Sequence, residues 1–298
     1  MLAIAQISDS FYYLHWIPSD RGPLVTQFGE VSFSNISQKE PDYYSYLIQS
    51  ILQKLQLELP VFTFTLDSSE VLFSQTNTHP EFSSEELVHW QLKQSTDQQF
   101  LDSYRVLSYS LTDQENILLN IHIPNTKIQS IDQAMKKIYG EMRSICVGIF
   151  SAEIGARSWM NAGKYGSYII WRMGKYNSDQ LLYVKNNELV AYCHSKRSIN
   201  SLKKMTLIGD EKVVDVFFED LNNFHSGSTD PFKSAEMVYV YQGEGKSTEL
   251  KKICESGIDN IRLLNPLSVL KCEEVSKGNL YLNSQLAETG VSFRGIDV

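Results

Sequence analysis

Hydrophobic and polar residues alternate along much of this chain in short runs that are typical of β-strands. Two such runs, 2–7 and 11–17, flank the small polar residues Ser8-Asp9-Ser10, and this arrangement predicts a β-hairpin that opens a sheet. Similar runs predict further strands in the first half of the chain, at 27–33, 61–66, 71–75, 104–109 and 116–123. The first half is therefore expected to be rich in sheet.

Apolar residues at spacings of three and four predict helices among these strands. The ranges 42–55 and 130–145 show this spacing, and the range 151–160 is a helix-like run of small residues. The range 146–150 lies between the last two helices and is expected to form a strand. Helices therefore alternate with strands, as in an α/β fold.

The same order of elements returns in the second half of the chain. Strand-like runs cover 168–174, 179–184 and 188–192, and a run with helical spacing covers 210–224. Asn186-Asn187 predicts a hairpin turn, because asparagine tolerates positive φ. Two copies of a hairpin-led unit predict an α/β fold with two lobes, which we place at 1–160 and 161–298.

One stretch of the second half combines a strand, a glycine turn and a helix. Val238–Gln242 is strand-like, Gly243 and Gly245 follow, and helical spacing starts near Ser247. Such a unit lets an anion approach the backbone at the helix N-terminus. It is not a P-loop, because that motif requires glycine where Val240 stands. A tight turn with no ligand is the alternative.

Composition and charge narrow the classes of protein. The 298 residues are 42% hydrophobic and 21% charged, with a net charge of −8, and nucleic-acid binding instead needs a basic face. We expect no membrane span and no signal peptide, because no long uncharged apolar run is present. The four scattered cysteines predict free thiols in the cytoplasm, and the six histidines show no metal-ligand spacing.

Four stretches, taken in order, resemble segments of one family. They are the helix–strand–strand run from Tyr43 through Gln75 with 84–93 after it, the strand-like Tyr104–Leu107, the helix end Asp220–Ser226 and the glycine turn Gln242–Leu250. Together with the duplicated α/β plan, they resemble the PilM-like proteins of type IV pilus and type II secretion assembly, relatives of FtsA. The resemblance covers nearly the whole chain. It implies the duplicated actin-like (RNase H-like) fold, with two lobes facing a cleft and a small inserted subdomain at about 36–110.

The residues that match the family's phosphate-binding hairpins depart from its motifs. The first hairpin of the family reads Asp-x-Gly-Ser-Ser, and the matching residues here are Gln6, Ser8, Asp9 and Ser10. An amide therefore replaces the acidic group, and the turn glycine is lost. In the second hairpin, Arg172-Met173-Gly174 stands where the family has Asp-x-Gly. Both carboxylates that the resemblance leads one to expect are absent.

The adenosine loop departs from the family as well, because Gln242 and Glu244 replace glycines and Glu244 brings negative charge towards a polyphosphate. By the resemblance, the residues of this degenerate nucleotide cleft are Ser8, Ser10, Gly174, Gly243, Gly245 and Lys246. Phosphoryl transfer needs Mg²⁺ and charge-stabilising donors. We therefore expect no catalytic residue, no metal site, no cofactor and no ATP hydrolysis, with weak ATP binding as the alternative.

The resemblance implies a scaffold function. The chain would be a non-catalytic cytoplasmic component of a pilus or secretion assembly platform, peripheral at the inner membrane. Its partner would be a bitopic inner-membrane protein, whose short cytoplasmic peptide binds the inserted subdomain; self-association is a further option for this fold. Two alternatives stay open: a nucleotide-binding actin-like ATPase with a regulatory role, and an actin-like protein with an unrelated partner.

Overall fold

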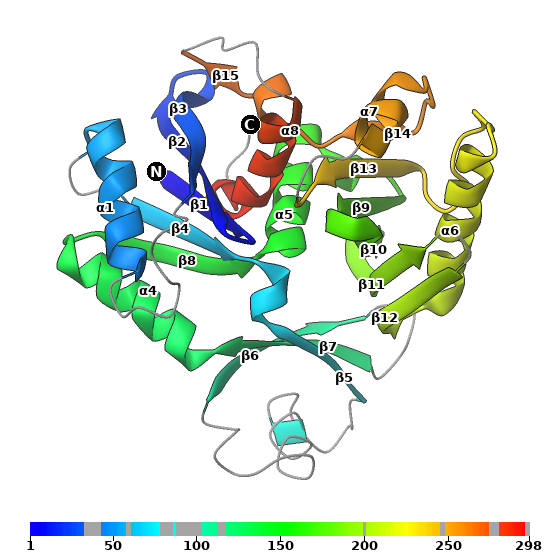
Figure 1. Ribbon diagram of the computed structural model, residues 1–298, viewed down its shortest axis with the longest axis horizontal. Coiled ribbons are helices and arrows are strands. Elements are labelled where there is room, and N and C mark those ends of the chain that lie inside the picture. The colour runs from blue at the N-terminus through cyan, green and yellow to red at the C-terminus, as the bar shows by residue number, and fades with distance from the viewer. Residues whose placement is uncertain are drawn as a thin grey trace. The chain divides into compact units, whose positions relative to one another are not determined.

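The computed structural model describes most of the chain, namely residues 1–32, 43–57, 61–77, 86–87, 103–111, 117–198, 201–244, 248–273 and 280–295. Two compact units share these residues (Figure 1). The first unit comprises Met1–Glu70, Asn125–Asn161 and Leu264–Val298, and the second comprises Val71–Pro124 and Ala162–Leu263. Each unit is therefore built from segments that lie far apart in the sequence.

The first unit contains a six-stranded sheet with the order β15-β3-β2-β1-β4-β8. Its strands are β1 (Leu2–Ile7), β2 (Ser10–Ser19), β3 (Gly22–Ser32), β4 (Val61–Leu66), β8 (Glu141–Val147) and β15 (Lys271–Cys272). Strands β1, β2 and β3 are antiparallel, whereas β4 runs parallel to both β1 and β8. Every residue of β1 is buried, as expected for an apolar central strand that is covered on both faces.

Two groups of helices pack on this sheet. Helix α1 (Tyr43–Leu55) contacts α4 (Asn125–Lys137), and its Tyr43 ring lies 5.8 Å from the ring of Phe11 on β2. Helix α5 (Gly148–Met160) contacts the 3₁₀ segment η5 (Leu286–Phe293), which follows α8 (Leu280–Gln285). Phe293 of η5 stacks on Trp16 of β2, with the ring centres 5.0 Å apart. The unit's short 3₁₀ turns are η1 (Ser68–Glu70) and η4 (Pro266–Ser268).

Residues 125–160 differ from the sequence-based expectation. The predicted helix 130–145 and strand 146–150 are wrong, because α4 ends at Lys137, β8 covers Glu141–Val147 and α5 starts at Gly148. Side-chain exposure alternates over residues 141–144 of β8, and these residues continue the parallel pairing with β4. Pairing with a neighbouring strand therefore prevailed over the helical spacing of this segment.

The second unit contains a six-stranded sheet with the order β12-β11-β10-β9-β13-β14. Its strands are β9 (Ser167–Met173), β10 (Ser178–Lys185), β11 (Glu188–Ser198), β12 (Ser201–Gly209), β13 (Met237–Gln242) and β14 (Ile261–Leu263). Strands β9 to β11 are antiparallel neighbours, and β13 runs parallel to β9. This repeats the plan of the first sheet, in which β1 to β3 are antiparallel and β4 runs parallel to β1.

Helices and a smaller sheet complete the second unit. The helices are α6 (Glu211–His225) and α7 (Thr248–Glu255), and the 3₁₀ turns are η2 (Ala162–Lys164) and η3 (Lys175–Asn177). Asp210 caps α6 by accepting a hydrogen bond from the Lys212 N–H at 2.9 Å. The smaller sheet has the antiparallel order β5-β7-β6, with β5 (Leu72–Asn77), β6 (Tyr104–Ser110) and β7 (Ile117–Pro124).

The two units do not follow the sequence-based bounds of 1–160, 161–298 and an insert at about 36–110. Helix α1 and strand β4 fall inside that insert, but β4 pairs with β1 in the first sheet. The three-stranded sheet groups with the second unit, and residues 264–298 return to the first. One of the passages between the units, from Asn161 to Ala162, lies one residue after the predicted boundary between 160 and 161.

Ser151 is a buried connection point in the first unit. Its hydroxyl donates to the Glu288 carbonyl at 2.6 Å and accepts from the Val291 N–H at 2.9 Å, and the Thr65 hydroxyl lies 3.1 Å away. We expect Ser151→Ala to lower the free energy of unfolding by about 1–3 kcal/mol, because a buried N–H loses its acceptor. Urea denaturation measures this change.

Ser158→Ala is the matched control for this experiment. Ser158 also lies on α5 and donates to a carbonyl of η5, that of Phe293, but over 3.3 Å and in a part-buried position. Its replacement should cost much less stability than that of Ser151. Equal losses in the two variants would show that Ser151 is not a special connection between α5 and η5.

Candidate functional site

The carboxyl ends of the parallel strands are where open α/β sheets place their ligand sites. In the first unit these are the ends of β1, β4 and β8, and they are followed by Ser8, Asp67 and Gly148. In the second unit they are the ends of β9 and β13, followed by Gly174 and Gly243. These two groups of residues, one in each unit, are the strand-end sites.

Asp67 organises the strand-end site of the first unit. It is 1% exposed, and its carboxylate accepts the Ser8 N–H at 3.0 Å and the Ser69 N–H at 2.8 Å. The first of these bonds holds the β1–β2 turn, where Ser8 has a left-handed φ of 56°. The carboxylate therefore fixes the turn from within the chain. Asp67 was not among the predicted site residues. Its position directly after the apolar strand β4 is the feature of the sequence that could have pointed to it.

The remaining polar side chains of this turn also have partners within the chain. The Ser10 hydroxyl donates to Glu30 at 2.8 Å, and the fully buried Gln6 donates through Nε2 to Glu70 at 3.4 Å. Ser8 and Ser10, both predicted phosphate contacts, are thus both engaged locally. Gln6, which replaces the family's acidic residue, lies beside a carboxylate instead of carrying one.

Glu288 lies at the N-terminus of α5. Its residue is fully buried, and a Cβ atom on Gly148 would lie 3.0 Å from Glu288 Oε2 and 3.1 Å from Ser68 Oγ. The N-cap residue of α5, Val147, provides no side-chain cap. A helix N-terminus favours negative charge. The chain therefore supplies its own carboxyl group at a helix end where a phosphate would otherwise be favoured.

The second unit brings Gly174 and Gly243 together. The two glycines follow the neighbouring parallel strands β9 and β13. The Gly243 N–H donates to the carbonyl of Met173, the residue before Gly174, at 2.8 Å. Gly174 opens the η3 turn, where a side chain on it would collide with the Ser178 carbonyl. The other two predicted site residues of this loop, Gly245 and Lys246, lie outside the described residues. The glycine at 174 is thus required by its own turn.

Arg172 occupies the space beside Gly243. It is 3% exposed, and a Cβ atom on Gly243 would lie 2.7 Å from Arg172 Cζ and 2.8 Å from its Nε. The absent side chain of Gly243 therefore makes room for a guanidinium of the same chain. The sequence shows that an arginine stands where the resembled family has a carboxylate. It does not show that this arginine is buried against Gly243.

Gln242 closes the same loop. It is fully buried, and its Nε2 donates to the Met173 carbonyl at 3.0 Å and to the Glu244 carbonyl at 2.5 Å. A glycine at this position would leave both of these bonds unmade. The replacement of a family glycine by Gln242 therefore ties the loop to the end of β9.

A charged network connects the elements around this loop. Arg197 on β11 bonds to Asp179 on β10 at 2.6 Å and to Glu249 on α7 at 3.0 and 3.2 Å. His225, the last residue of α6, lies 2.9 Å from Glu249. The network joins two strands to the ends of two helices. The charge-assisted bonds of Arg197 to Glu249 hold α7, the helix that follows Gly243, in place.

Side chains of the chain itself lie beside the glycines of both strand-end sites. On the side of β9 and β13, Arg172 lies beside Gly243, and Gln242 bonds to the Met173 and Glu244 carbonyls. On the side of β1, the carboxyl group of Asp67 holds the Ser8 turn, and that of Glu288 lies beside Gly148. Within the described part of the chain, no three His, Cys, Asp or Glu side chains are grouped to hold a metal ion.

Comparison with known proteins identifies the fold. No protein-family model matches the chain, and no curated protein matches it in sequence. A chain of the PilM–PilN type IV pilus biogenesis complex is similar in structure, with a TM-score of 0.66 and 11% identity over 100% of this chain and 98% of that one. The predicted class, a duplicated actin-like α/β fold, is therefore confirmed. Within that class, the predicted resemblance to PilM-like proteins is confirmed for the fold.

Two further solved structures are similar to this chain at lower TM-scores. The cytoplasmic domain of EpsL, an inner-membrane component of the type II secretion system of Vibrio cholerae, has a TM-score of 0.45 and 9% identity, over 98% of this chain and 94% of that one. A Bacteroides thetaiotaomicron protein with an actin-like ATPase fold has a TM-score of 0.43 and 9% identity, over 88% and 89%. Among the residues that the structure describes, no helix is both long and apolar enough to cross a membrane.

Asp179 makes the charged network sensitive to pH. It is 1% exposed, and burial raises the pKa of Asp179 from 3.8 to about 6, although the Arg197 charge opposes this shift. Because the folded-state pKa is raised, the stability that this carboxyl contributes is fully present below pH 3.8 and is lost as the pH rises through about 6. We expect Asp179→Asn to remove this loss of stability with rising pH. A shift of about two pKa units corresponds to a loss of roughly 3 kcal/mol in the free energy of unfolding.

Urea denaturation of both proteins across this pH range measures the difference in slope. Glu188→Gln is the control, because Glu188 is an exposed carboxylate at the start of β11 in the same unit. The control should keep the pH profile of the original chain. Parallel profiles for Asp179→Asn and the original chain would contradict the assignment.

Proposed function

We propose that this chain is a non-catalytic scaffold of a pilus or secretion assembly platform, on the cytoplasmic side of the inner membrane. The observation that carries the proposal is the filling of both strand-end sites by the chain's own side chains, Glu288 beside Gly148 and Arg172 beside Gly243. A body that keeps the actin-like fold and fills its strand-end sites with its own side chains would use its surfaces for binding. The likeness to a chain of the PilM–PilN complex supports the setting.

The proposed partner is a bitopic inner-membrane protein, which contributes a short cytoplasmic peptide. The three-stranded sheet offers a place for an extended peptide, because β6 is an outer strand that pairs only with β7 among the described residues. Peptides bind outer strands by strand addition. The side chains of Arg105 and Tyr109 are exposed on β6.

A thermal-shift measurement with ATP and Mg²⁺ tests the loss of nucleotide binding. We expect millimolar ATP–Mg²⁺ to change the melting temperature of the whole chain by less than about 1 °C, because a ligand raises stability only when it binds the folded state. ATP without Mg²⁺ is the control for non-specific anion effects. A saturable, Mg²⁺-dependent increase would overturn the non-catalytic assignment.

A regulatory ATP-binding protein is the second candidate function, and one observation favours it. The first unit carries carboxyl groups from two different segments near its strand ends: those of Asp67 and Glu70 follow β4, and that of Glu288 lies on η5. One of them would have to replace the carboxylates lost from the two hairpins. If ATP–Mg²⁺ shifts the melting temperature, Glu288→Gln and Asp67→Asn would show which carboxyl group is responsible.

Peptide binding is tested on the outer strand of the small sheet. The probe is a fluorescent peptide with the cytoplasmic N-terminal sequence of a bitopic protein encoded beside this chain, and its anisotropy reports binding. We expect Arg105→Glu combined with Tyr109→Ser to weaken binding at least about tenfold, by removing exposed contacts on β6. Tyr176→Ser is the control, because Tyr176 is 75% exposed on a different part of the second unit. Equal affinities in both variants would place the peptide elsewhere.

A further inference from the structure

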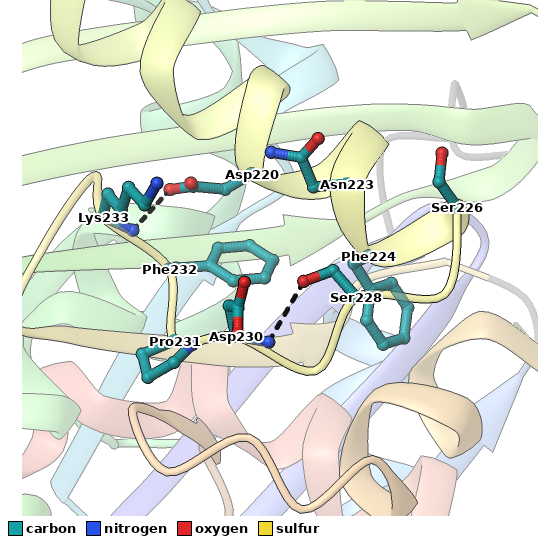
Figure 2. A pocket seen from close by; sticks show the side chains of 9 residues that line it. All are labelled: Asp220, Asn223, Phe224, Ser226, Ser228, Asp230, Pro231, Phe232 and Lys233. Carbon is teal, nitrogen blue, oxygen red and sulfur yellow. Dashed lines mark hydrogen bonds between the residues drawn. The ribbon is translucent and has the colours of Figure 1, made fainter.

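A pocket lies at the C-terminal end of α6 in the second unit. Its volume is about 330 Å³, within the range of small-molecule and side-chain sites. Figure 2 shows Asp220 and Asn223 extending from α6, and Ser228, Asp230 and Phe232 lying on the loop that follows the helix. None of these residues belongs to the strand-end sites. The pocket is therefore a separate feature of the unit.

The walls of this pocket are held in place by hydrogen bonds. Asp220 is 7% exposed, and its Oδ2 accepts the Lys233 N–H at 2.8 Å and the Ser234 N–H at 2.9 Å. The Phe232 N–H donates to Asn260 Oδ1 at 2.9 Å, and Asn260 Nδ2 donates back to the Phe232 carbonyl at 2.7 Å. The loop is thus fixed at its far end, and a ligand would meet a preformed cavity, which lowers the entropic cost of binding.

The charges around the pocket favour a cation. The carboxyl groups of Asp220 and Asp230 both line it, and only Oδ2 of Asp220 takes part in the two backbone bonds. The last turn of α6 forms one wall, and a helix C-terminus carries partial negative charge. One cation, Lys233, also lines the pocket. Two carboxylates and a helix C-terminus outweigh this single ammonium group.

The aromatic side chains select the kind of cation. Phe224 is half-buried and lines the pocket together with the two carboxyl groups, so its ring is the one available for stacking. Phe232 also lines the pocket, but it is 4% exposed and packs edge-on against Phe217. A guanidinium group is planar, stacks on aromatic rings, and forms paired hydrogen bonds with a carboxylate. An ammonium group gains less from such a site because it is a strongly hydrated point charge. The lining therefore suits arginine better than lysine, and it disfavours phosphate.

We propose that this pocket binds the guanidinium group of an arginine side chain in the cytoplasmic segment of the partner. The identity of the partner rests on the proposed function, whereas the chemistry of the pocket does not. Cytoplasmic segments next to a membrane span carry an excess of lysine and arginine. A basic segment also complements the net charge of −8 of this chain. The pocket thus adds a second, charge-specific contact to the proposed strand addition on β6.

Titration of the whole chain with Nα-acetyl-arginine amide, followed by amide NMR shifts, tests the pocket without the partner. We expect saturable shifts of the amide signals of Ser228 and Lys233, and no such shifts from the neutral isostere Nα-acetyl-citrulline amide. Asp230→Asn should weaken the binding about tenfold, since a charge-assisted bond is lost. Asp230 is exposed on the loop, so this variant should fold normally.

Glu188→Gln removes one exposed carboxylate elsewhere in the same unit and should leave the affinity for the arginine probe unchanged. Equal shifts from the citrulline probe, or unchanged binding by Asp230→Asn, would overturn the proposal, as would preferential binding of inorganic phosphate at these signals. If the arginine probe binds but the peptide of the bitopic protein does not, the proposed function fails and the guanidinium site stands.

Discussion

The close approach of η5 to α5 is the contact on which the first unit depends. A Cβ atom on Gly290 would lie 2.5 Å from the Gly155 nitrogen and would also collide with the Ser151 carbonyl, so only glycine allows this spacing. The contact joins residues that are more than a hundred positions apart. It also carries Glu288 to the N-terminus of α5. Packing of the C-terminal segment therefore decides which charge occupies this helix end.

The second unit reaches a similar result by different residues. There, Arg172 projects from β9 into the space that Gly243 leaves, and Gln242 bonds across to the same strand. In both units a glycine at the end of a parallel strand faces a buried ionisable side chain of the same chain. Burying such a group is costly. The packing that places Arg172 and Glu288 beside these glycines must therefore offset that cost.

Local features of the sequence predicted much of the fold. The polar turn at Ser8 to Ser10 predicted the first hairpin, and the run 210–224, which begins at the capping residue Asp210, predicted α6. Both predictions depend only on residues that are close together in the sequence. The end of α4 was predicted wrongly, because the pairing of β8 with β4 joins residues far apart in sequence. The sequence also shows directly that Gln6 and Arg172 stand where the resembled family has acidic residues, because residue identity at a motif is a local feature.

The positions of Asp67, Glu288 and Arg172 could not be read from the sequence. Asp67 acts through the Ser8 N–H, 59 residues away, and Glu288 acts near Gly148 through the packing of η5. Such side chains gain their role only from tertiary contacts. The sequence therefore showed that Gln6 and Arg172 stand where the resembled family has carboxylates, and the structure shows which side chains lie beside the two strand-end glycines.

A side chain that lies beside a strand-end glycine differs from a bound ligand in one respect. A ligand shifts an equilibrium between two conformations only by binding one of them more tightly than the other. A side chain such as Arg172 or Glu288 is always present, so it cannot provide a signal that appears and disappears as a bound ligand does. A buried titratable group can change its state with pH, and the pKa of Asp179, which burial raises to about 6, lies near neutrality. The charged network around Asp179 can therefore respond to pH.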